Sequence, residues 1–279
     1  STLSSSSAAS DVYKRQVYWK ATTNNEYTST AYYYLDYKLM ARFASLLGKD
    51  AAPYQEKANT LKSLINQKFF NAETGVYAEG TQTAQALALY LGLVPEGKEQ
   101  LVADKLREVV AGNNYFLDFG LLGSKTVPAM LTKYGYIEDA MKMITKTEAP
   151  SWGYWVETMG YSTLPETWTL SPKFADASLN HVFMGDVSAW MMNQLAGINH
   201  DDSAPGFRHI RITPHFVKEL DWAKGEYHSV RGRIASEWKR EGDQVMLTVT
   251  IPADCSADIV VGDQTETVSA GTHTFSYPV

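Results

Sequence analysis

The stretch APSWGYWVETMGYSTLPETWTLSPKFADASLNHVFMGDVSAWMMNQLAGI, residues 149–198, sets acidic side chains among aromatic rings. It holds two glutamates, Glu157 and Glu166, and four tryptophans, which are Trp152, Trp155, Trp168 and Trp190. Aromatic rings stack on the apolar face of a sugar, and carboxylates transfer protons or activate water, so the stretch fits a sugar-cleaving pocket. The alternative is a helical core with packed tryptophans and surface glutamates, because aromatic side chains serve packing more often than function.

Upstream of this stretch, the apolar residues follow a helical period. In residues 30–47 they recur every three or four positions until Gly48 ends the pattern. The same reasoning predicts helices over residues 51–70, 81–91, 98–111, 120–133, 136–145 and, as the last long helix, 178–195. Residues 81–91 carry few charges and are expected to be buried, whereas 98–111 are charged on one side. This alternation predicts two concentric rings of helices, an inner and an outer one.

The polar segment HDDSAPG, residues 200–206, predicts a boundary between a helical domain (17–199) and a second domain (206–279). Beyond it the apolar period changes to two, which predicts strands over residues 208–213, 230–239, 244–251, 257–261 and 271–277, with a hairpin turn at 240–243. These strands are typical of a small antiparallel β-sandwich. They show no exposed aromatic run beyond Trp238, so this domain is expected to stabilise its neighbour rather than to bind carbohydrate.

Residues 1–16, STLSSSSAASDVYKRQ, are rich in Ser and Ala and have no hydrophobic period. Their tail resembles translated adapter sequence from a sequencing library, so the segment is expected to be foreign to the natural gene. A flexible, disordered linker is the alternative. Since the chain also begins without Met, its natural start is expected to be missing, and the segment is excluded from fold reasoning.

Composition excludes several classes of function. The net charge of −6 and the pI of about 5.5 argue against a nucleic-acid partner. The single cysteine, Cys255, excludes an internal disulfide and a cysteine-based zinc site. No apolar run approaches the roughly 18 residues of a membrane span. The six histidines show no ligand spacing, so nothing indicates a metal or an organic cofactor, and calcium alone stays open. The cellular compartment and the oligomeric state stay open.

Short motifs follow one another along the chain. The helical part contains TAYYY (30–34), TQTAQALAL (81–89), LDFGLLG (117–123), SWGY (151–154), STLPETW (162–168), SLNH (178–181) and LAGI (195–198). The β part contains FRHIRITP (207–214) and VRGRIASEWK (230–239). In this order the motifs resemble those of bacterial α-L-rhamnosidases, which are six-hairpin glycosidases, from about residue 18 to the C-terminus.

The resemblance implies a mainly helical chain with an (α/α)6 barrel followed by a small β domain. The chain has about seven predicted helices, fewer than six hairpins need, so it corresponds to the second half of such a barrel. The implied activity is the hydrolysis of terminal α-L-rhamnose from rhamnosylated small molecules or polysaccharides, with inversion of the anomeric configuration.

The resemblance also implies roles for individual residues. Glu166 in STLPETW takes the position of the general base, although Pro165 stands where the family commonly has Trp. Glu157 is the alternative acid. In SLNH, His181 matches a histidine that contacts the sugar, and Asn180 is a weaker candidate for contact. The predicted stacking residues are Trp152 and Trp168, and for both the alternative is a place in the wall or core.

The general acid of this family belongs to the first half of the barrel, for which the chain has no matching segment. The chain alone is therefore expected to be inactive. Three other interpretations stay open: a six-hairpin glycosidase for another sugar, a non-catalytic carbohydrate-binding or interaction protein, and a purely structural helical repeat.

Overall fold

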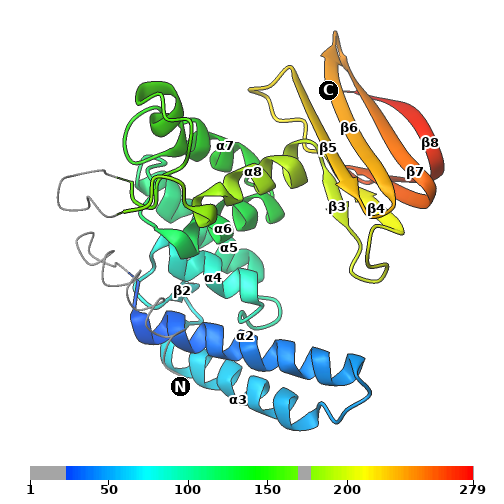
Figure 1. Cartoon of the computed structure of the whole chain (residues 1–279). Coiled ribbons are helices and arrows are strands. Elements are labelled where there is room, and N and C mark those ends of the chain that lie inside the picture. Colours follow the sequence, from blue (N-terminus) through cyan, green and yellow to red (C-terminus); the bar gives the residue numbers. More distant parts are fainter. Residues whose placement is uncertain (1–22, 169–176, 279) are drawn as a thin grey trace. The chain divides into compact units, whose positions relative to one another are not determined.

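The computed structural model describes residues 23–168 and 177–278, and the chain divides into two compact units. The first unit, Ser1–Met184, is built from helical hairpins, and the second, Gly185–Val279, consists of a short helical segment and a β domain (Figure 1). The predicted linker at 200–206 lies inside the second unit, where it follows the short strand β3 (Ile198–His200).

Within its described residues, the first unit contains three helical hairpins. They pair α2 (Asn25–Leu46) with α3 (Ala52–Phe69), α4 (Gln82–Leu91) with α5 (Glu99–Gly112), and α6 (Leu121–Lys133) with α7 (Ile137–Thr145). Helix α4 also contacts α2 and α6, so α2, α4 and α6 make one layer and their hairpin partners make the other. This arrangement is the predicted partial barrel of helical hairpins.

The burial of α4 and α5 follows their sequences. Nearly every side chain of α4 is buried, as its lack of charged residues predicts, whereas α5 buries one face made of Val102, Ala103, Leu106 and Val110. The Thr81 side chain accepts a hydrogen bond from the Ala84 amide at 3.1 Å and caps the start of α4. Gly92 ends the helix with a φ of +74°, a conformation that suits glycine.

The predicted long helix over 178–195 is wrong in its first part. Helical structure begins at Val182, with a 3₁₀ turn (Val182–Gly185), helix α8 (Asp186–Trp190) and a π-helical turn (Met191–Leu195). The carbonyls of Ser178 and Leu179, which would accept bonds from the next helical turn, instead accept from the Glu166 amide and the Thr163 hydroxyl. His181 therefore precedes the helix rather than lying within it.

The β domain is a six-stranded sheet in the order β3-β4-β7-β6-β5, with β8 also paired to β7. Its other strands are β4 (His209–Ile212), β5 (Trp222–Ser229), β6 (Gly232–Glu241), β7 (Gln244–Val261) and β8 (Gln264–Pro278). Sequence patterns missed β3 and β5 and divided β7 into two strands. One strand pair, β4 with β7, is parallel, so the prediction of a wholly antiparallel domain is wrong at that pair.

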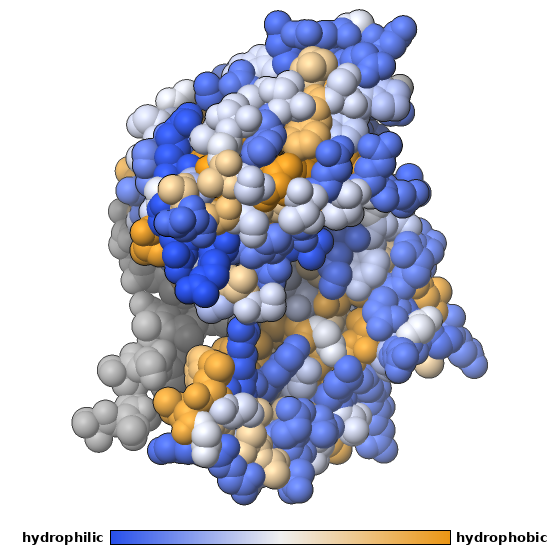
Figure 2. Space-filling model, turned by 90° about the vertical axis from the view of Figure 1, so that its right-hand side faces the viewer, coloured by the Kyte–Doolittle hydropathy of each residue, from blue (hydrophilic) through white to orange (hydrophobic). Residues whose placement is uncertain are grey.

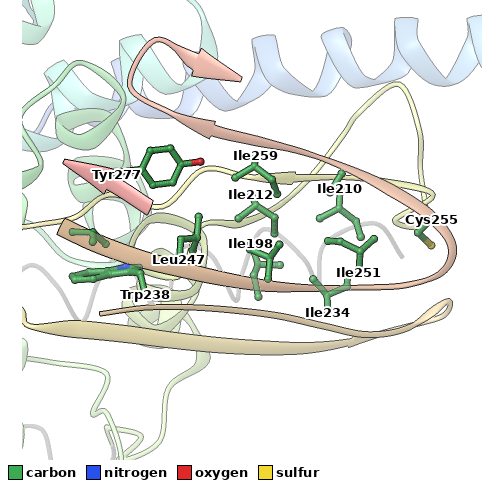
Figure 3. Close-up of a cluster of buried hydrophobic side chains, with 13 residues drawn as sticks. Ile198, Ile210, Ile212, Ile234, Trp238, Leu247, Ile251, Cys255, Ile259 and Tyr277 are labelled. Atoms are coloured by element: carbon green, nitrogen blue, oxygen red, sulfur yellow. The ribbon is translucent and has the colours of Figure 1, made fainter. Parts of the chain in front are cut away.

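Strand β7 serves two parts of the sheet. Its first part pairs with β6 and its last part with β4, and the register of its pairing with β8 shifts between Ile251 and Ser256. The inward side chains of the strands enclose one hydrophobic cluster (Figure 3). Trp238, expected on the surface, is wholly buried there, and its indole donates to the carbonyl of Leu195 at 2.7 Å. The exposed aromatic side chains of this domain are instead Trp222 and Tyr227.

Helix α2 leaves apolar side chains exposed. They include Tyr33, Leu39, Met40, Phe43 and Leu46, and Leu46 is 74% exposed. In the lower part of Figure 2, hydrophobic surface gathers over the α2–α3 pair. Contiguous apolar surface of this kind promotes association between proteins.

We therefore expect the isolated chain to self-associate with rising concentration, and Phe43→Glu to reduce this association, because it places a charge within the exposed apolar face of α2. Sedimentation velocity over a concentration series measures the effect. Gln55→Glu on α3 adds the same charge at an exposed position outside this face and serves as the control. Equal association of Phe43→Glu and the wild type would contradict the expectation.

Candidate functional site

Two loop segments, residues 163–166 and 178–181, are hydrogen-bonded to each other. The amide of Glu166 donates to the carbonyl of Ser178 at 2.8 Å, and the amide of His181 donates to the carbonyl of Leu164 at 2.8 Å. The hydroxyl of Thr163 donates to the carbonyl of Leu179 at 2.7 Å. The structure thereby brings the motifs STLPETW and SLNH, which carry Glu166 and His181, into one paired loop.

Glu166 and His181 are both half-buried in this loop. One carboxylate oxygen of Glu166, Oε2, accepts a hydrogen bond from the Ser178 amide at 3.1 Å, which fixes the orientation of the carboxylate. Nδ1 of His181 is buried and has no hydrogen-bond partner in the part of the chain that the structure describes. A buried polar atom without a partner is uncommon in folded proteins, and functional sites are one place where it occurs.

The other predicted site residues lie at varying distances from this arrangement. Asn180 is exposed within the same paired loop, and its backbone amide donates to the Ser178 hydroxyl at 3.2 Å. Glu157 is exposed on the π-helical turn Tyr154–Thr158, outside the paired loop. The structure therefore groups Asn180 with Glu166 and His181 and places Glu157 on another segment.

Trp152, Trp155 and Trp168 pack against one another. Trp155 stacks on Trp168 with ring centroids 4.3 Å apart, and Trp152 meets Trp168 edge-on at 5.2 Å. All three rings are buried, and their indole nitrogens donate to the carbonyls of Met184, Trp168 and Phe119, respectively. In this geometry Trp152 and Trp168 form a wall of packed aromatics, and their stacking on a sugar stays a prediction.

Sequence reasoning did not single out Asp118, although it lies within the motif LDFGLLG. Asp118 sits between α5 and α6, and burial raises the pKa of its carboxyl from 3.8 to about 6, partly opposed by hydrogen bonds from its own amide and that of Gln82. Its Oδ1 is buried without a hydrogen-bond partner among the described residues. The available signal was a single acidic side chain inside the apolar run of residues 117–122. Perturbed carboxyls of this kind cluster at functional sites.

The starts of the inner helices lie together at one end of the first unit. The Thr23 and Thr81 hydroxyls, which precede α2 and α4, are hydrogen-bonded at 2.6 Å. Gln82, at the start of α4, is bonded to Asp118, which precedes α6. The Trp168 indole is bonded to Phe119, next to Asp118, so the loop of Glu166 is attached at this same end.

The described part of the chain offers no metal site, since none of its His, Cys, Asp and Glu side chains form a group of three or more that could hold an ion. Within residues 23–168 and 177–278, no helix has the length and apolar character needed to cross a membrane.

Comparison with known proteins identifies the family. Residues 4–195 match the model of the bacterial α-L-rhamnosidase six-hairpin glycosidase domain, and residues 197–276 match that of the bacterial α-L-rhamnosidase C-terminal domain. The chain belongs to the bacterial α-L-rhamnosidase family. The first match begins inside the segment 1–16 that the sequence analysis set apart, in a part of the chain outside the described residues.

Individual rhamnosidases share both sequence and fold with the chain. The α-L-rhamnosidase of Streptomyces avermitilis is 29% identical over 85% of this chain. Its crystal structure in complex with L-rhamnose superposes on 89% of the chain with a TM-score of 0.81 and 26% identity. The α-L-rhamnosidase of Dictyoglumus thermophilum superposes on 90% of the chain with a TM-score of 0.81 and 30% identity.

The chain spans only part of the length of these relatives. It covers 23% of the Streptomyces sequence, 26% of the Streptomyces structure and 32% of the Dictyoglumus structure. Among rhamnosidases, this chain therefore corresponds to a fragment.

The raised pKa of Asp118 predicts how stability depends on pH. Because the folded state binds this proton more tightly than the unfolded state, the contribution of Asp118 to the free energy of unfolding rises as the pH falls from about 7 to about 4. The rise is at most about 3 kcal/mol, since one pKa unit corresponds to about 1.36 kcal/mol. Asp118→Asn has no charge to bury, so at about pH 7.5 its free energy of unfolding is expected to be higher than that of the wild type.

Urea unfolding of both proteins at several pH values, followed by far-UV circular dichroism, measures this difference. The advantage of Asp118→Asn should shrink as the pH falls from about 7 towards about 4, because Asp118 of the folded wild type is then protonated and no longer carries a buried charge. A difference that stays constant with pH would show that Asp118 does not titrate between these limits.

Proposed function

We propose that the chain is the C-terminal part of an α-L-rhamnosidase that removes terminal α-L-rhamnose from glycosides, with Glu166 as the general base of an inverting reaction. The observation that carries this proposal is the paired loop, which holds Glu166 and His181 on hydrogen-bonded segments at the end of the unit where the inner helices begin. The Streptomyces relative, whose structure contains L-rhamnose, supports the choice of sugar.

In an inverting glycosidase, one carboxylate removes a proton from water while a second, protonated carboxyl protonates the leaving oxygen. Glu166 is suited to the first task, because a backbone amide orients its carboxylate on a fixed loop. Pro165 fixes its own φ and restricts Leu164, which limits the motion of the segment further. His181 is half-buried in the same paired loop as Glu166, which would place it near a sugar held at this loop.

The second carboxyl of an inverting pair lies about 6.5–9.5 Å from the first, with room for a water between them. Glu157 is exposed on another segment and does not lie in the paired loop. As the resemblance to rhamnosidases implies, we assign the general acid to the first half of the barrel, for which this chain has no matching segment. The isolated chain holds the base without the acid and is inactive under this proposal.

The test uses the full-length protein and an aryl α-L-rhamnoside. We expect Glu166→Gln to lower kcat by about 10²–10⁴-fold, because the neutral amide cannot accept a proton from water. Glu157→Gln, on its exposed turn, is the matched control and should retain turnover. Loss of turnover in Glu157→Gln together with full activity in Glu166→Gln would move the base to Glu157.

Two further measurements test the rest of the proposal. Proton NMR of the first product should show β-L-rhamnose if the reaction inverts, and α-L-rhamnose if it retains configuration. A panel of aryl glycosides separates rhamnose from other sugars. Measurable rhamnoside turnover by the isolated 279-residue chain would contradict the assignment of the general acid to another segment.

A further inference from the structure

The motifs TQTAQALAL (81–89) and LDFGLLG (117–123) meet at a hydrogen-bonded bridge between Gln82 and Asp118. The Gln82 amide donates to Oδ2 of Asp118 at 3.4 Å, and the Asp118 amide donates to Oε1 of Gln82 at 3.4 Å. The Gln82 side chain also donates to the carbonyl of Phe116 at 2.8 Å. Since Gln82 is wholly buried at the start of α4, the bridge fixes this helix to the loop that leads into α6.

One bond of the bridge, from the Gln82 backbone amide to Oδ2, depends on the charge of Asp118. A carboxylate accepts stronger hydrogen bonds from backbone amides than a neutral carboxyl does. Burial raises the pKa of Asp118 to about 6, and the Gln82 amide and the Asp118 amide oppose this rise. No charged side chain contributes to this shift of the pKa. The bond to Oδ2 is therefore expected to weaken when Asp118 itself takes up a proton, as the pH falls through about 6.

The bridge reaches the aromatic wall through the next residue, Phe119. The carbonyl of Phe119 accepts the hydrogen bond of the Trp168 indole, and its ring lies 6.0 Å from Trp152 and 6.3 Å from Trp168. Gly123 lies directly against Phe119, where an added Cβ would come within 2.3 Å of the Phe119 Cβ. Phe119 therefore has little freedom to move independently of α6.

We propose that the Gln82–Asp118 bridge positions the loop of Glu166, acting through Phe119 and Trp168. Trp168 follows Glu166 by two residues, so a displacement of Phe119 reaches the carboxylate along a short path. Asp118 is a positioning residue in this arrangement and does not touch the substrate. The role of Glu166 rests on the proposed function, whereas the mechanical link from Asp118 to Trp168 does not.

The first experiment follows the aromatic wall of the isolated chain by near-UV circular dichroism between about pH 4.5 and 8. The wild type should show a transition with a midpoint near pH 6, because Trp168 follows the protonation of Asp118. Asp118→Asn, which has nearly the same shape and no titrating group, should lack the transition. A transition that persists unchanged in Asp118→Asn would overturn the proposal.

Two controls isolate Asp118. His181 belongs to the paired loop and lies 5.5 Å from Phe183, so His181→Gln tests whether the histidine causes the signal, and the transition should survive. Asp104→Asn makes the same substitution on the outer helix α5, where Asp104 bonds to Tyr136, and should also keep the transition. Loss of the transition in His181→Gln would assign it to the histidine and overturn the proposal.

A second variant keeps the test decisive if Asp118→Asn does not fold. Gln82→Met keeps a side chain of similar length and the backbone amide that bonds Asp118 Oδ2, but removes the acceptor for the Asp118 amide and the donor to Phe116. We expect this variant to shift or abolish the near-UV transition. A transition identical to that of the wild type would mean that the side-chain bonds of Gln82 do not transmit the protonation of Asp118, and would overturn their part in the proposal.

In the full-length protein, the pH profile of kcat/KM separates positioning from a purely structural role. The wild type should show a step near pH 6 that is absent from Asp118→Asn, whereas a structural role would lower activity equally at every pH. Absence of rhamnoside turnover in the full-length wild type would refute the proposed function and leave the near-UV result standing. A wild-type profile in Asp118→Asn would refute the positioning role alone.

Discussion

The hydrogen bond from the Trp168 indole to the carbonyl of Phe119 joins the loop of Glu166 to the helical layers. A long loop between helices has no regular backbone pattern of its own, so its position depends on such anchors. The bonds between residues 163–166 and 178–181 hold these segments to each other, whereas the indole bond holds them to the helices. Packing of Trp155 and Trp152 on Trp168 keeps the anchor buried, where a polar contact is worth more than at the surface.

The helical period predicts the hairpin helices well because each of them is fixed by its own buried face. Helix α4 and helix α5 differ in polarity in the way that an inner and an outer layer require, and the structure buries them accordingly. The same period fails at residues 178–181, where the backbone amides bond to residues 164 and 166. A pairing between distant segments leaves no trace in a local pattern of apolar residues.

The β domain was predictable where strands alternate and unpredictable where they do not. The turn at 240–243 and its flanking strands β6 and β7 follow the alternation, and Ile234 and Trp238 lie on one face because they are an even number of residues apart. Strand β5 escapes recognition because it is an edge strand with mostly exposed, polar residues. Strand β7 looks like two strands because its pairing is irregular between Ile251 and Ser256, where the chain passes from one set of partners to another.

At the site, motifs located Glu166 and His181, but not the bridge of Gln82 with Asp118, because its partners are 36 residues apart and meet only when α4 packs beside the loop before α6. An asparagine at position 118 would offer a similar shape without a buried charge, so we expect the aspartate to lower the free energy of unfolding at neutral pH. A side chain that lowers stability in the structural framework of a site needs a compensating advantage, and functional sites are where such side chains concentrate. We therefore expect the charge of Asp118, beside the anchor of the Glu166 loop, to serve the proposed site rather than the stability of the fold.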